Sequence, residues 1–229
     1  IEGSTFKARF CPTLAGRWDL VEVKSNAKEL DGQRRGEHVA ATPSKHPGFW
    51  EVDAENAGGR WYRRSDGSHP YVFGNTQYSF LSGYRDTGPL PNFDLAADVA
   101  NNVKFFKKLR FALTADRYPH PTEKPFLDAA GKPTDAGDCS DRPNPRWFRQ
   151  RADVAVRAAY DHDLIADLIL CGPDTDDSRA TLRPKGGDPA PWLKYMAARY
   201  GSYPNVWVCL CNEYDIKTKY PPADVARWG

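Results

Sequence analysis

An apolar run, Val206–Cys211, that ends abruptly in polar residues constrains the fold more than any other stretch of the chain. Both alternating sets of its side chains are apolar, which is typical of a strand covered on both faces in a parallel sheet. Ligands of such folds bind where the strands reach their carboxyl ends. Glu213, with Asn212 beside it, is therefore a candidate acid/base at the strand's end, unless the strand simply runs into an ordinary polar loop.

Upstream segments predict further strand and helix pairs of the same kind. Apolar spacing favours a helix over Phe93–Lys108, which begins near Asp94, and a second helix over Arg146–Tyr160. Strands are expected at 71–74, 109–114, 164–171 and 206–211. This alternation predicts an α/β fold with a parallel sheet.

The loop after the second predicted strand is long and rich in Pro, Gly and Asp, from Ala115 to Pro145. Loops of this length are usually functional, and in a barrel they lie on the active-site face. Candidate sugar contacts at its start are Asp116, Arg117, Tyr118 and His120. A passive loop position remains the commoner role for any single histidine.

Two groups of residues could suggest metal sites. Cys171, Cys209 and Cys211 lack the usual zinc spacing, so packing residues are favoured over a zinc site. The acidic segment 174–179 lacks the Gly and terminal Glu of a calcium loop, so a solvated loop is favoured there, with Asp174 a further candidate substrate contact. No cofactor is expected.

The charge balance and the aromatic content narrow the function classes. Lysines and arginines number 32 against 30 acids, which argues against a nucleic-acid partner. No apolar run approaches the roughly 20 residues that span a bilayer. The chain has 7 Trp and 11 Tyr, and although most are expected in the core, aromatic faces suit sugar rings.

The stretch Trp192–Trp207, followed by Asn212-Glu213, resembles the helix 3 to strand 4 passage of the clan A glycoside hydrolases, and most of all their apiosidase-like bacterial families. The resemblance implies that Glu213 is the acid/base and that Asn212 binds a sugar hydroxyl beside the cleaved bond. Arg110 is similar to an arginine that lies under the catalytic carboxylates in this clan. A surface arginine at the strand's entry is an equal alternative.

The amino-terminal part carries a second resemblance. The stretch Phe6–Trp18 resembles the Ig-like domain that precedes the barrel in many of these enzymes. Arg60–Pro70 reads as a β-hairpin with an Asp-Gly turn, and Tyr71–Tyr78 is similar to the end of barrel strand 1. By that match Asn75 and Tyr78 are substrate contacts, and the expected domains are 1–64 and 65–229.

Length decides how much of a barrel to expect. A complete (β/α)8 barrel needs about 250 residues, whereas this chain has 229. The expected fold is the amino-terminal half of a (β/α)8 TIM barrel, preceded by part of an Ig-like β-sandwich. The remaining half would come from the same gene or a second chain and would carry the nucleophile on strand 7.

The expected function is a retaining glycosidase, secreted or periplasmic, that acts on plant, algal or bacterial polysaccharide fragments. Its partner is a carbohydrate substrate, with neither nucleic acid nor membrane. Two alternatives remain: a non-catalytic carbohydrate-binding protein of the same fold, and an unrelated sheet protein that happens to contain Asn-Glu.

Overall fold

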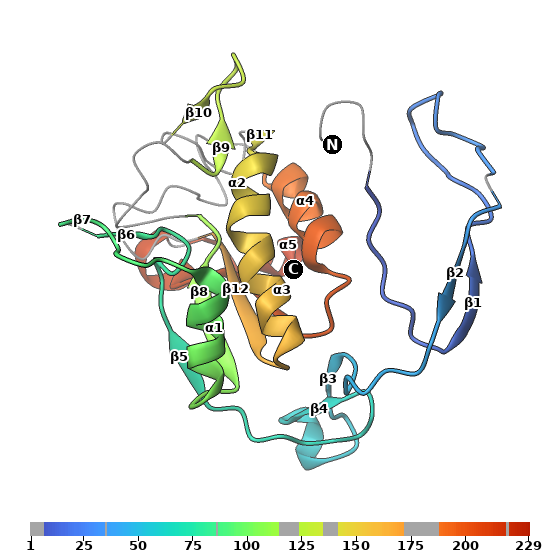
Figure 1. Ribbon diagram of the computed structural model, residues 1–229, viewed down its shortest axis with the longest axis horizontal. Coiled ribbons are helices and arrows are strands. Elements are labelled where there is room, and N and C mark those ends of the chain that lie inside the picture. Colours follow the sequence, from blue (N-terminus) through green and yellow to red (C-terminus); the bar gives the residue numbers. More distant parts are fainter. Residues whose placement is uncertain are drawn as a thin grey trace. The chain divides into compact units, whose positions relative to one another are not determined.

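The computed structural model describes residues 7–34, 36–85, 87–114, 124–134, 142–171, 188–218 and 220–229 (Figure 1). The chain divides into two compact units. Phe10–Ser68 form one unit, and residues up to Arg9 together with His69–Gly229 form the other.

A four-stranded parallel sheet in the order β13-β12-β8-β5 is the centre of the larger unit. Its strands are β5 (Gly74–Thr76), β8 (Lys108–Ala112), β12 (Ile165–Cys171) and β13 (Val206–Cys211). The predicted α/β class with a parallel sheet is confirmed. The strand expected at 71–74 begins later than predicted, because its pairing with β8 starts only at Gly74.

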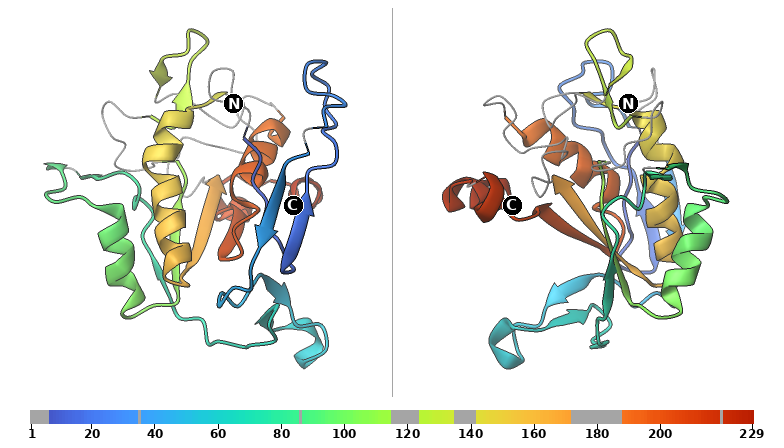
Figure 2. Two further views of the ribbon diagram at one scale, coloured as in Figure 1. Left: turned by 45° about the vertical axis from the view of Figure 1, so that its right-hand side comes forward. Right: turned by 90° about the vertical axis from the view of Figure 1, so that its left-hand side faces the viewer.

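The helices of this unit are α1 (Leu95–Val103), α2 (Pro145–Gln150), α3 (Ala152–Asp161), α4 (Ala190–Tyr200) and α5 (Pro222–Trp228). The Asp94 side chain caps α1 by accepting hydrogen bonds from two backbone N–H groups. Figure 2 shows α1 and α3 side by side over the sheet. The helix predicted over Phe93–Lys108 is shorter than expected, because Lys108 already belongs to β8.

The helix predicted over 146–160 is two helices that meet at Arg151. Its backbone (φ −125°, ψ −76°) leaves the helical region. The buried guanidinium donates to the carbonyl oxygens of Leu81 at 2.7 Å and Ser82 at 3.0 Å. The spacing of apolar residues does not predict this break, because the hydrogen bonds that stabilise it join Arg151 to residues far away in the sequence.

The core lies where the helices cover the sheet. All seven residues of β12 are buried, and all but Asp167 are apolar, which is typical of a strand covered on both faces. Leu109, Phe111 and Leu113 face the same core as Val99 of α1 and Val156 of α3. Between β8 and α2, a small sheet is formed by β9 (Phe126–Leu127), β10 (Pro133–Thr134) and β11 (Arg142–Pro143). This sheet contributes Phe126 to the core, where its ring packs against that of Trp192 with the centroids 5.2 Å apart. That sheet lies in the stretch expected to be a long loop on the active-site face.

A two-residue ribbon, β6 (Tyr84–Arg85) with β7 (Gly88–Pro89), completes the strands of this unit in the described part. No helix in the described ranges is both long and apolar enough to cross a membrane.

The smaller unit contains two antiparallel pairs. β1 (Gly16–Asp19) pairs with β2 (His38–Ala41), and β3 (Trp50–Val52) pairs with β4 (Tyr62–Arg64), with the short helix η1 (Ala57–Gly59) between β3 and β4. The predicted Asp-Gly turn is present, since the Gly67 N–H donates to the Arg64 carbonyl at 2.8 Å. The Arg64 N–H also donates to the Ser68 carbonyl across the turn at 2.9 Å, but the described residues directly after the turn form no strand, and the strand that pairs with β4 is β3. The Ig-like sandwich stays a prediction.

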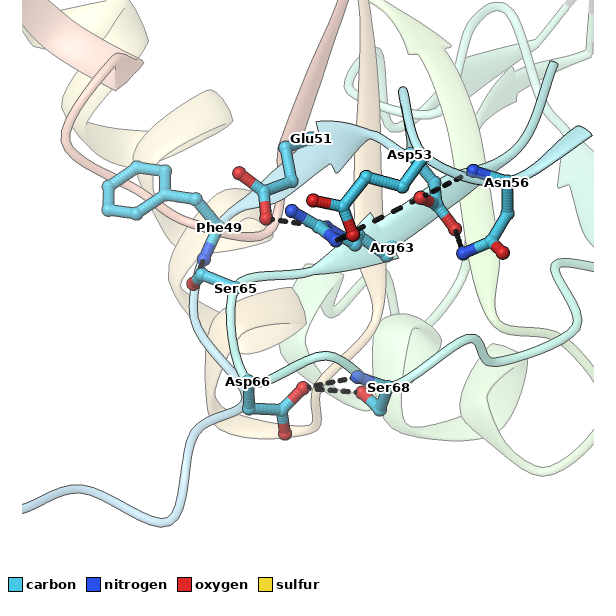
Figure 3. A network of polar contacts seen from close by, with 9 residues as sticks. Phe49, Glu51, Asp53, Asn56, Arg63, Ser65, Asp66 and Ser68 are labelled. Carbon is cyan, nitrogen blue, oxygen red and sulfur yellow. Dashed lines mark hydrogen bonds and ion pairs between the residues drawn. The ribbon is translucent and has the colours of Figure 1, made fainter. Parts of the chain in front are cut away.

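Figure 3 shows the polar contacts that hold β3 and β4 together. Arg63 donates to Glu51 at 2.9 Å, and the fully buried carboxylate of Asp53 accepts two hydrogen bonds from Asn56 at 2.7 and 3.2 Å. The Glu51 hydrogen bond, followed by the charge of Glu51, raises the pKa of Arg63. These bonds satisfy a buried charge in a unit with little apolar core.

Candidate active site

Asn212 follows β13 directly and is held from two sides. Its backbone N–H donates to the Cys171 carbonyl of β12 at 3.2 Å, which continues the sheet pairing by one residue. Its side-chain Oδ1 accepts from Arg110 Nη2 at 2.5 Å. Because arginine can only donate, this bond fixes the orientation of the amide and leaves its NH2 as a donor. That NH2 makes no hydrogen bond to any described residue, so it is available to a ligand hydroxyl.

Arg110 comes from β8, two strands away from β13 in the sheet. Its guanidinium crosses β12 and also donates to Cys209 Sγ at 3.2 Å. Its buried Nε has no hydrogen-bond partner among the described residues. The structure thus places Arg110 on the inward face beside Asn212 and not on the outer surface.

Glu213 has an unusual backbone. Its φ of 49° lies in the left-handed region, which costs an L-residue about 1–2 kcal/mol. The other described non-glycine residues with positive φ are Asn92 and Asp163, side-chain types that tolerate this region. Within the described residues the exposed Glu213 carboxylate has no hydrogen bond or ion pair. Strain of this kind clusters at functional sites.

A π-helical turn, Tyr214–Thr218, follows immediately, and the Glu213 carbonyl accepts from the Ile216 N–H at 3.2 Å. Such turns are rare and are often found at functional sites. The sequence signal for Glu213 was its position after the strand. Nothing in the sequence indicated its backbone conformation.

The predicted substrate contacts Tyr78 and Asn75 lie in different places relative to the site. Tyr78 lies at the carboxyl edge of the sheet, since its carbonyl accepts from the Ala112 N–H at 3.1 Å, and it is 41% exposed. Asn75 is the register partner of Leu109 and donates to Asn102 of α1 at 2.8 Å. The structure does not bring Asn75 to the Arg110–Asn212 cluster, because strand alternation turns it toward the helix. Thr76, not Asn75, pairs with Arg110.

Four predicted loop contacts, Asp116, Arg117, Tyr118 and His120, lie outside the described residues. The same holds for Asp174. Their roles stay predictions.

One ion pair, on the same face of the sheet as Arg110, was not predicted from the sequence. Lys108 Nζ binds Asp167 Oδ2 at 2.9 Å and lies 5.5 Å from the ring centroid of Trp207. The signal was a lone Asp in the apolar strand 165–171. Asp167 precedes the end of its strand by four residues, about 13 Å along the strand, so it lies too deep to work beside Glu213.

The cysteines and acidic groups assemble no metal centre in the ranges described. No group of three or more His, Cys, Asp or Glu side chains there could hold an ion. Cys171 and Cys211 are register partners on adjacent strands and are buried, and both carry thiols.

Comparison with solved structures finds this fold elsewhere. A candidate glycoside hydrolase from Bacteroides vulgatus ATCC 8482 matches 96% of this chain with a TM-score of 0.68 at 23% identity. A glycoside hydrolase family 5 structure from the same organism matches 76% (TM-score 0.46, 14% identity), and an endo-1,4-beta-mannanase from Rhizomucor miehei matches 67% (TM-score 0.46, 12% identity).

The chain spans 43%, 35% and 46% of those three structures. No family model and no curated protein matches the sequence. By the first of these likenesses, the chain has the fold of part of that candidate glycoside hydrolase.

Proposed function

We propose that this chain is part of a retaining glycosidase of clan A, related to the apiosidase-like families, in which Glu213 is the acid/base and Asn212 binds the sugar hydroxyl beside the cleaved bond. One observation carries the proposal. Glu213 has a strained left-handed backbone at the carboxyl edge of a parallel sheet, next to an amide that Arg110 orients. The likeness to a candidate glycoside hydrolase supports it.

In this chemistry Glu213 protonates the departing glycosidic oxygen and then takes a proton from water. A second carboxylate, about 5–5.5 Å away, attacks the anomeric carbon in a retaining enzyme. Arg110 holds the Oδ1 atom of Asn212, so the amide NH2 can donate to the sugar. Tyr78 lies at the same edge and offers an aromatic face.

Two further proposals accompany this function. The strands that complete the barrel, and the nucleophile Glu on strand 7, come from the remaining half, in the same gene or a second chain. Residues 1–64 belong to an Ig-like domain, and the enzyme works in a secreted or periplasmic setting on polysaccharide fragments.

The test is Glu213→Gln in the full-length protein, which keeps the side-chain shape and removes the acid. Hydrolysis of substrates with poor leaving groups should fall about 10²–10⁴-fold, while activated aryl glycosides lose less, because a good leaving group needs little protonation. The matched control is Asp215→Asn, an exposed carboxylate two residues along. Equal, small losses for both substrate types would remove Glu213 from this role. Sugar binding without hydrolysis by the parent protein would favour the non-catalytic alternative.

A further inference from the structure

The backbone of Glu213 is held more firmly than its side chain. Upstream, Asn212 is fixed by its bonds to Cys171 and Arg110. The exposed Glu213 carboxylate has no hydrogen bond or ion pair within the described residues. A left-handed L-residue persists only where its surroundings over-determine it, so something must also fix the chain on the downstream side.

Downstream, the contacts come from Tyr220 and Trp228, which together we call the α5 clamp. The Tyr220 N–H donates to the Tyr214 carbonyl at 3.1 Å and closes the π-helical turn. Tyr220 is 9% exposed, and its ring meets that of Trp228 of α5 edge-on, with the ring centroids 5.6 Å apart. In the right-hand view of Figure 2, α5 lies beyond the carboxyl end of β13.

The clamp is tied to the main core. Tyr220 belongs to the buried cluster, and Tyr214, Val225 and Trp228 pack against that cluster while partly buried. The residue after Glu213 is thus fixed by packing as well as by a hydrogen bond. The two sides of Glu213 are anchored to different elements, β8 and β12 upstream and α5 downstream.

We infer that Tyr220 is a positioning residue, which acts through the Tyr214 carbonyl and its ring contact with Trp228 to keep Glu213 in the left-handed conformation that presents its carboxyl group at the sheet edge. The inference about the backbone stands on the geometry alone, and its catalytic meaning rests on the proposed acid/base function of Glu213. Without the clamp, Glu213 relaxes to an ordinary backbone conformation and its carboxyl group leaves the sheet edge.

The first test compares Gly and Ala at position 213, by hydrogen exchange with mass spectrometry on peptides spanning 212–220 in the full-length protein. While the clamp holds the φ of residue 213 positive, the backbone amides of these peptides should exchange about fivefold more slowly in Glu213→Gly than in Glu213→Ala. The reason is that glycine adopts the left-handed region without penalty, whereas alanine does not. In a Tyr220→Ala background the difference should vanish or reverse, since Ala is the better residue in an ordinary conformation.

Ala226→Gln, on the exposed side of α5, is the matched control and should leave the fivefold difference intact. Trp228→Leu is the milder variant that keeps the test open if Tyr220→Ala does not fold, and it should also shrink the difference. A fivefold Gly preference that survives in both clamp variants overturns the inference.

The second test separates positioning from stability by kinetics. Tyr220→Ala should lower kcat on substrates with poor leaving groups at least about tenfold and change KM less than about threefold, because substrate binding does not need the carboxyl group in place. An unchanged kcat overturns the positioning role. If the parent protein hydrolyses no glycoside, the proposed function fails while the exchange experiment still decides the backbone inference.

Discussion

At the scale of single residues, the amide of Asn212 is the most tightly specified group of the site. It is 8% exposed, and its Oδ1 is committed to Arg110. Because the amide is planar, this bond also fixes the directions in which its two N–H groups can donate. A donor held in place before the substrate arrives stabilises developing charge more than the ground state.

We expect Asn212→Ala to lower kcat by about 10²-fold and to weaken ground-state binding much less, because the hydrogen bond to the sugar hydroxyl strengthens in the transition state. Steady-state kinetics and binding of an unhydrolysed analogue measure the two effects. A turnover number equal to that of the parent would contradict the assignment of Asn212.

Arg110 supports that amide, so its removal should affect both stability and activity. Arg110→Met leaves the buried Oδ1 of Asn212 without a donor, which we expect to cost about 1–3 kcal/mol in unfolding free energy, with a fall in kcat. Arg110→Lys keeps a charge but not the reach of the guanidinium fork, and should restore little activity. Denaturant titration and kinetics check the pair. Full activity in Arg110→Met would remove Arg110 from the site.

At the scale of elements, helix caps and contacts between helices stabilise the unit that carries the site. The Asp94 side chain accepts from the Ala96 and Ala97 N–H groups at 3.0 and 3.1 Å. Asp94→Ala should cost about 1 kcal/mol of unfolding free energy by leaving those donors to water. Asp98→Ala is the control, because the cap side chain is that of Asp94, and the substitution keeps the Asp98 backbone groups that bond Asp94 and Asn102. A smaller loss for Asp94→Ala than for Asp98→Ala would contradict the capping assignment.

The contact between α3 and α4 is a partly buried polar network. Arg199 donates to Asp153 at 2.8 and 2.6 Å, and the Tyr200 hydroxyl donates to the same carboxylate at 3.1 Å. Burial, followed by the Asp153 charge, raises the pKa of Tyr200 well above its usual value. Burial also raises the pKa of Tyr195, which accepts from Arg199 at 2.9 Å.

These shifts predict a loss of stability in alkali. Below about pH 10 the tyrosines are neutral in both states, and above it the unfolded chain releases a proton that folded Tyr200 retains. Unfolding free energy should therefore fall as pH rises above about 10, and Tyr200→Phe should remove about 1.4 kcal/mol per pH unit of that slope. Denaturant titrations at several pH values measure it. An unchanged slope in Tyr200→Phe would contradict the shift.

At the scale of the whole molecule, the described sheet has two open edges. β5 and β13 each pair on one side only, and Val208 on β13 is 59% exposed. Open parallel edges with exposed apolar side chains favour association with further strands. Together with a match to 43% of a longer structure, they support the proposal of a remaining barrel half.

We expect the 229 residues expressed alone to be neither a stable monomer nor an active glycosidase. Size exclusion with mass spectrometry and an aryl glycoside assay test this. Co-expression with the remaining half is the control that should restore both properties. A monodisperse 25.7 kDa species that hydrolyses glycosides would show that the barrel interpretation is wrong.

The sequence alone determined the buried strands and the place of Asn212 and Glu213. The largely apolar run at 164–171, interrupted only by Asp167, and the apolar run at 206–211 predicted β12 and β13 closely, because few other structures leave a run in which both alternating sets of side chains are apolar. Asp94 marked the start of α1 in the same local way. These features depend on neighbours in the chain.

Tertiary structure decided what depends on distant residues. The break at Arg151 and the turn of Asn75 toward α1 each rest on partners far along the chain, and β4 pairs with β3 across the residues between them. The bond from Arg110 to Asn212 joins residues 102 positions apart. Glu213 adopts its left-handed backbone only because packing and hydrogen bonds on both sides outweigh the local preference of an L-residue, and no local pattern encodes that balance.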